Sequence, residues 1–104
     1  MGLSRLNVWI TAPGDPCTID DKNPWRVTIV NCRLQVLQWC DKKYTGLPAK
    51  CGHLEIDVPP GCYVLFAGVR ERFTYPAAVE ACCNEHVCVK LVVPREPLKR
   101  PPLP

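Results

Sequence analysis

The sequence of 104 residues has no apolar run of about 20 residues, the length that a membrane-spanning helix needs. It also shows no basic segment followed by an apolar run, as a secretory signal would. From these absences we expect a cytoplasmic protein without a membrane partner. Secretion stays open, because a chain whose signal has been removed would look the same.

Motifs of the common enzyme classes are missing as well. There is no glycine-rich phosphate loop, no Gly-x-Ser-x-Gly and no His-Glu-x-x-His. The two histidines, His53 and His86, have no particular thiol placed beside them, so a cysteine-dependent hydrolase is the least favoured function. The 13 basic residues are spread among 10 acidic ones and the net charge is only +3, which disfavours nucleic-acid binding. We therefore predict a protein that is not an enzyme.

What the sequence does have is 12 prolines and 8 cysteines in a composition that is 47% hydrophobic and 22% charged. That balance is typical of a folded globular chain, and the length allows one domain. We assign residues 1–94 to the domain. Residues 95–104 are expected to form an extended, proline-rich tail.

Alternation of apolar and polar residues predicts strands along most of the chain. We expect strands at 6–12, 25–39, 53–58, 62–69, 73–79 (interrupted at Pro76) and 87–93. In the second of these, Cys32 is expected to share the buried face with Val30 and Leu34. Trp9 falls on the polar face of the first strand.

The segment Pro59-Pro60-Gly61 separates two of these strands. Proline presets φ at the corner of a turn, and glycine accepts the positive φ of a type II turn. We therefore expect a hairpin in which Val58 faces Gly61 and the two strands pair with each other.

Residues 52–68 carry a resemblance to a known family. Gly52, an alternating strand through Val58, Pro59-Pro60-Gly61, Tyr63 and a second apolar strand resemble the prealbumin-like sandwiches, in particular the carboxypeptidase-regulatory-like and collagen-adhesin B-type domains. The resemblance implies an all-β fold, a Greek-key sandwich of about seven antiparallel strands, with Tyr63 facing the core. It also implies an accessory, adhesion or assembly role rather than a specific activity.

The eight cysteines allow three interpretations. They are buried thiols, a disulfide framework, or metal ligands. For a disulfide, Cys83 and Cys88 are the candidate pair, whereas Cys51 and Cys62 would lie far apart along the expected hairpin. The candidate metal ligands are Cys82, Cys83, His86 and Cys88, with zinc as the metal; their spacing only approximates a zinc site. The favoured expectation is no cofactor.

The function that we favour is protein–protein assembly, as a homo-oligomer or as an accessory subunit for a protein partner. Both faces of the strand at 62–66 are apolar, and tryptophans lie at strand edges, where they supply contact area at low entropic cost. The predicted interface residues are Trp9, Trp39, Val64, Phe66, Leu98, Pro101 and Pro102. The alternative is a Cys/His metal-binding or redox module.

Overall fold

The computed structural model describes residues 2–11, 25–39, 42–69, 72–93 and 100. They contain strands and turns but no helix, so no helix among them could cross a membrane. The strands are β1 (Ser4–Thr11), β2 (Trp25–Asn31), β3 (Gln38–Trp39), β4 (Lys42–Lys43), β5 (Leu47–Ala49), β6 (His53–Val58), β7 (Gly61–Val69), β8 (Arg72–Phe73), β9 (Ala77–Ala81) and β10 (His86–Val92). The all-β prediction is confirmed.

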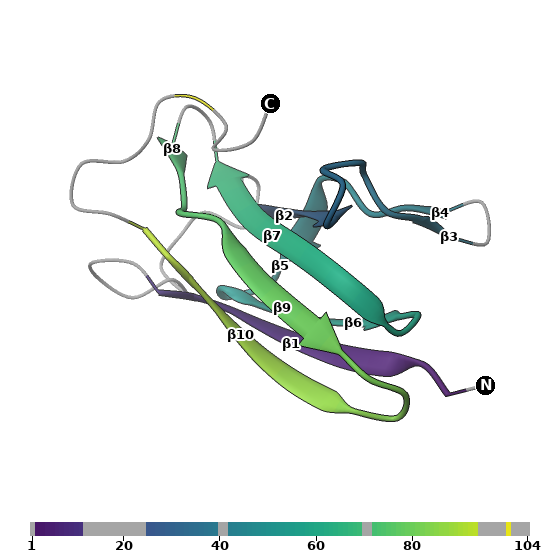
Figure 1. The fold of residues 1–104 in the computed structure, drawn as a ribbon. Helices are drawn as coiled ribbons and strands as arrows, with labels where there is room; N and C mark the ends of the chain where they lie inside the picture. The colour runs from purple at the N-terminus through teal and green to yellow at the C-terminus, as the bar shows by residue number, and fades with distance from the viewer. Residues whose placement is uncertain (1, 12–24, 40–41, 70–71, 94–99, 101–104) are drawn as a thin grey trace.

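Two sheets make up the sandwich-like body, as Figure 1 shows. Sheet A has the order β10-β1-β6, and sheet B has the order β5-β2-β7-β8, with β9 also paired to β7. The short strands β3 and β4 form a separate two-stranded ribbon. Strand β7 is therefore central in sheet B, and β1 is central in sheet A.

The core lies between the sheets because alternate side chains of each strand point inward. In β1, Leu6, Val8 and Ile10 are buried, whereas Arg5, Trp9 and Thr11 are exposed. The other sheet contributes a matching set of buried side chains, namely Trp25, Val27 and Ile29 from β2 and Tyr63, Leu65 and Ala67 from β7. The alternation predicted for residues 6–12, 53–58, 62–69 and 87–93 is thus seen in β1, β6, β7 and β10.

The expected hairpin at Pro59-Pro60-Gly61 is wrong. Strand β6 pairs with β1, and β7 pairs with β2, β8 and β9, so the corner carries the chain from one sheet to the other. Gly61 does not adopt a positive φ; among the glycines of the described segments, Gly46 and Gly52 do. The Tyr63 hydroxyl donates a hydrogen bond to the Pro59 carbonyl and closes this corner, and Tyr63 is buried as the resemblance implied.

The uniformly antiparallel arrangement is also wrong in one place. Strand β10 runs parallel to β1, with Leu6 opposite Val87 and Ile10 opposite Leu91. A crossover through sheet B separates the two strands in the sequence, so the chain can return in the same direction. Both strands then present their aliphatic residues to the same core.

The long strand predicted for residues 25–39 is interrupted. Strand β2 ends at Asn31, and a turn follows in which Leu34 has a φ of 62°. The buried residues of β2 have odd numbers up to Ile29, so Cys32 lies on the outside and is exposed, contrary to expectation. The proline-rich tail at 95–104 lies outside the described residues, apart from residue 100.

Candidate interaction surfaces

The outer face of sheet A is a three-stranded surface that points away from the core. Ladder register places its side chains in rows across β6, β1 and β10. We use the name "outer face of sheet A" for His53, Glu55 and Asp57 from β6, Arg5, Asn7, Trp9 and Thr11 from β1, and His86, Cys88, Lys90 and Val92 from β10.

Trp9 lies in the central column of this face. It is 46% exposed, although its aromatic neighbour His53, directly opposite on β6, stacks against it with ring centroids 3.9 Å apart and an angle of 18° between the planes. On the other side, Lys90 of β10 is in register with Trp9. Cross-strand neighbours of this kind restrict a side chain. The stack on His53 thus holds the exposed indole in position.

Charges on this face are divided between its two edges. Glu55 and Asp57 lie on β6, whereas Lys90 lies on β10. The Arg5 Nε–H donates a hydrogen bond to the Asp57 Oδ1, 3.0 Å away, and the two side chains form an ion pair. This hydrogen bond lowers the pKa of the Asp57 carboxyl below its ordinary value. Within the described segments, Glu55 and Lys90 have no ion-pair partner. Among the described residues, each edge therefore keeps one charged side chain outside any ion pair, and the two charges have opposite sign.

The outer face of sheet B is different. Val64 and Phe66, both predicted as interface residues, lie on the outer side of the central strand β7 and are half-buried. Val64 is in register with Val30, which is only 5% exposed although it too points outward. Phe66 contacts the ring of Phe73 at a centroid distance of 6.5 Å. Side chains of the neighbouring strands, such as Val30 on β2 and Phe73 on β8, cover these apolar residues in part.

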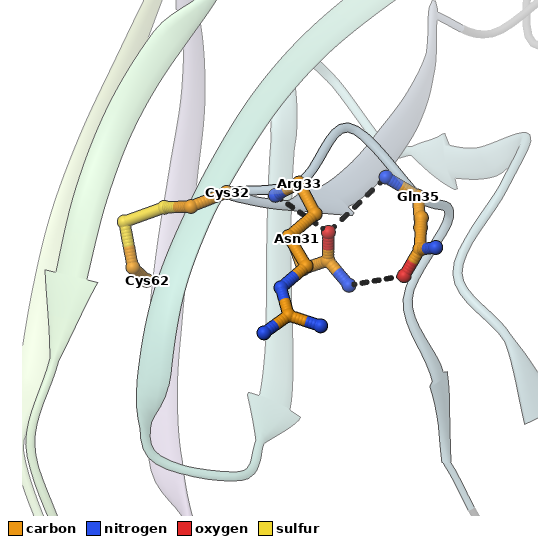
Figure 2. The surroundings of a disulfide bond; sticks show 5 residues. All are labelled: Asn31, Cys32, Arg33, Gln35 and Cys62. Carbon is orange, nitrogen blue, oxygen red and sulfur yellow. Dashed lines mark hydrogen bonds between the residues drawn. A yellow bond between two sulfur atoms is a disulfide. The ribbon is translucent and has the colours of Figure 1, made fainter.

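A disulfide between Cys32 and Cys62 joins the end of β2 to the start of β7 (Figure 2). The Cα atoms are 5.6 Å apart, as expected for adjacent strands. This bond was missed because the expected hairpin paired the strand that carries Cys62 with residues 53–58, whereas that strand pairs with β2. In the actual register Asn31 faces Tyr63, so Cys32 falls beside Cys62.

The same disulfide anchors the loop after β2. The Asn31 side-chain carbonyl accepts hydrogen bonds from the backbone N–H groups of Arg33, at 2.9 Å, and Gln35, at 3.1 Å (Figure 2). The Leu34 N–H donates to the Asn31 carbonyl at 2.9 Å. These bonds hold Leu34 in the left-handed region and leave it 46% exposed, next to Val36 at 45%. The loop is a second, smaller exposed apolar feature.

The predicted disulfide between Cys83 and Cys88 is not formed. Cys83 lies in the turn closed by the Glu85 N–H and the Cys82 carbonyl, whereas Cys88 lies within β10. Strands β9 and β10 belong to different sheets, so the two cysteines are not cross-strand partners. Both are exposed, as is Cys82, and the charges of Glu85 and Glu80, with burial, raise the pKa of the Cys82 thiol.

The candidate metal ligands Cys82, Cys83, His86 and Cys88 are not brought together. No group of three or more His, Cys, Asp or Glu side chains in the described part of the chain could hold a metal ion. Cys88 is in register with Asn7 on the outer face of sheet A, away from the turn that contains Cys83.

Several predicted interface residues lie outside the described residues. These are Leu98, Pro101, Pro102 and the side chain of Trp39. Alternation alone puts His53, Glu55 and Asp57 on one face of residues 53–58, but it cannot bring Lys90 and Trp9 to the same face. That step requires knowing that β1 lies between β6 and β10. The signal that could have been used is the shared polar alternation of the three segments.

No protein-family model matches the chain, and no curated protein matches it. The exposed surfaces and their chemistry are therefore the basis for proposing a function.

Proposed function

We propose that this chain is a non-catalytic assembly module that associates with itself through the outer face of sheet A. The observation that carries the proposal is Trp9, which is 46% exposed and lies on the central strand of that face. Tryptophan is among the residues that contribute most to protein interfaces, because it buries a large area with few rotatable bonds.

The surroundings of Trp9 support the same function. The stack on His53 and the adjacent Lys90 restrict the indole, so little side-chain freedom remains to be lost on binding. Arg5, Asn7 and Glu55 provide a polar rim, which is typical of an interface that forms and dissociates. An accessory or assembly role is also what the resemblance to prealbumin-like sandwiches implies.

The Cys32–Cys62 disulfide supports a second element of the proposal. Structural disulfides persist where the environment is oxidising. We propose that the protein works in such a compartment, in place of the cytoplasm expected from the sequence. The prealbumin-like topology stays part of the same proposal and is supported by the buried Tyr63 at the Pro-Pro-Gly corner.

A metal or redox module is the competing function, for which Cys82, Cys83, His86 and Cys88 were the candidates. Elemental analysis of the purified protein tests it. One zinc or iron per chain, with loss of the fold on chelation, would favour that function over assembly.

Sedimentation velocity across a concentration series tests the assembly function. We expect wild type to form a dimer whose fraction rises with concentration and Trp9→Ala to sediment as a monomer. Leu34→Ala is the matched control, because Leu34 is as exposed as Trp9, at 46%, but lies in the loop after β2 of sheet B. A wild-type protein that stays monomeric up to about 1 mM would contradict self-association.

A further inference from the structure

We infer that two copies pack face to face through the outer face of sheet A, about a two-fold axis that runs along β1, so that Glu55 of each copy meets Lys90 of the other. This inference rests on the proposed function and specifies the geometry of the contact. It follows from the way in which charges and strands are ordered across the face.

The order of the three strands places the acidic and basic side chains of this face on opposite sides. Strand β1 is central, the acidic residues Glu55 and Asp57 lie on β6 to one side, and Lys90 lies on β10 to the other. Asp57 is already paired with Arg5 at 3.0 Å, so Glu55 and Lys90 are the acidic and basic side chains of this face that form no ion pair with another described residue. They lie on opposite sides of β1 and one row apart, because Glu55 is level with Asn7 and Lys90 is level with Trp9.

Symmetry limits the ways in which two copies can pack through this face. A contact between identical surfaces is isologous, and for two sheets packed face to face the two-fold axis lies in the plane between them. If that axis runs along β1, the β6 column of one copy faces the β10 column of the other, and the two β1 strands face each other. If it runs across the strands, β6 faces β6 and β10 faces β10.

The two arrangements differ in which charged side chains they bring together. An axis along β1 brings Glu55 opposite Cys88 of the second copy, one residue row from Lys90, within reach of two long side chains across sheets packed about 10 Å apart. An axis across the strands brings Glu55 towards Glu55, and like charges in contact are unfavourable. Both arrangements keep the strands of the two sheets aligned, which is the common way for sheets to pack, so the charges decide between them.

The size of the face sets the strength of the contact. Three strands spaced about 4.8 Å apart, over the seven residues from Arg5 to Thr11, give a projected area of roughly 300–400 Å² per copy, whereas stable interfaces bury about 800 Å² per partner. We therefore expect a reversible dimer that dissociates on dilution and weakens at high salt.

Charge reversal tests this geometry directly. Glu55→Lys and Lys90→Glu should each weaken the dimer by roughly tenfold or more, because each creates two like-charge contacts per dimer. In an equimolar mixture of the two variants both contacts become attractive again. We expect sedimentation velocity to show monomers for each variant alone and dimers in the mixture. The single chain carrying both substitutions should also dimerise.

The control is a second pair of substitutions with the same charge changes elsewhere. Glu80→Lys on β9 and Lys43→Glu on β4 alter exposed residues of sheet B and of the ribbon. Each should dimerise like wild type, alone and in mixture. Circular dichroism of all four variants should match wild type, which shows that the comparison concerns association and not folding.

The outcomes separate the inference from the proposed function. If wild type dimerises but the Glu55→Lys and Lys90→Glu variants do not rescue each other, the geometry is wrong and the assembly function stands. Preferential pairing of Glu55→Lys with wild type would show that like columns face each other, which also overturns the inference. A wild type that is monomeric at every concentration overturns both.

Discussion

The outward side chains of the two sheets differ in polarity and in how far they are exposed. On sheet B, the outward residues Val30, Val64 and Phe66 are apolar and are covered by neighbouring parts of the chain. On sheet A, the outward residues are mostly polar or charged, yet the largest of them, Trp9, is left 46% exposed.

This difference separates residues that stabilise the fold from residues that are available for contact. An apolar outer strand had suggested an interface on β7, but β7 is central in sheet B and its outward residues Val64 and Phe66 are half-buried, with Phe66 against Phe73. The polar face, where a large aromatic residue is unexpected, is the better candidate. A buried polar group or an exposed large apolar one is more informative than residues that follow the ordinary pattern.

The largest effect should come from the disulfide that joins β2 to β7. It closes a loop with a sequence separation of 30, for which chain entropy predicts about 3 to 4 kcal/mol of stabilisation. The double variant Cys32→Ser with Cys62→Ser should lose about that much in urea unfolding, whereas Cys82→Ser with Cys83→Ser should not, because those thiols form no disulfide. A change below about 1 kcal/mol in the first variant would contradict a structural role for this bond.

A smaller loss is expected at Thr74, which is fully buried beside β7. Its hydroxyl accepts the N–H of Ala67 at 3.0 Å, and its own N–H donates to the Ala67 carbonyl at 2.9 Å. Thr74→Val keeps the shape but leaves the Ala67 N–H without its acceptor, at a cost of about 1 to 3 kcal/mol. Thr74→Ser retains the hydroxyl and is the control for that hydrogen bond; equal losses in both variants would show that the bond contributes little.

At Trp9 the effect on stability should be smaller still, although we expect a large effect of this substitution on the proposed association. Trp9→Ala removes an exposed cross-strand stack, which is worth about 0.2 to 1 kcal/mol. Urea unfolding of the monomer at low concentration measures this loss. An unfolding free energy lowered by more than about 2 kcal/mol would place Trp9 among the residues that stabilise the fold rather than those held ready for a partner.

The smallest effect concerns the exposed Arg5–Asp57 pair. The hydrogen bond from Arg5 lowers the pKa of Asp57 below 3.8 in the folded protein. A lowered folded-state pKa means that the pair stabilises the protein above the ordinary aspartate pKa, and that this contribution is lost as the pH falls through the lowered value. An NMR titration should find the Asp57 pKa below 3.8 in wild type and closer to the ordinary value in Arg5→Gln. Identical titrations of the two proteins would contradict the pairing.

Strand content was predictable because alternation reports which side chains of a segment are buried. Residues 6–12 and 87–93 show this clearly, since Leu6, Val8, Val89 and Leu91 are all in the core. Alternation does not report which strands are neighbours. The Pro-Pro-Gly corner is equally compatible with a hairpin and with a crossing between sheets, and the choice depends on β6 finding its partner in β1.

The same limit explains the errors at the candidate sites. The Cys32–Cys62 bond depends on β2 ending at Asn31 and on the β2–β7 register, neither of which a local pattern specifies. The face around Trp9 combines residues from segments that lie far apart in the sequence. Trp9 itself was predictable from its position on a polar face; its neighbours His53 and Lys90 followed only from the sheet order.

The most direct test of the account compares the two faces in one experiment. Backbone amide shifts of the ¹⁵N-labelled wild type are followed by NMR as the protein concentration is raised. The account predicts that the changing signals come from β1, β6 and β10, centred on Trp9, and that β2 and β7 around Val64 and Phe66 stay constant. Changes confined to sheet B, or none at any concentration, would contradict it.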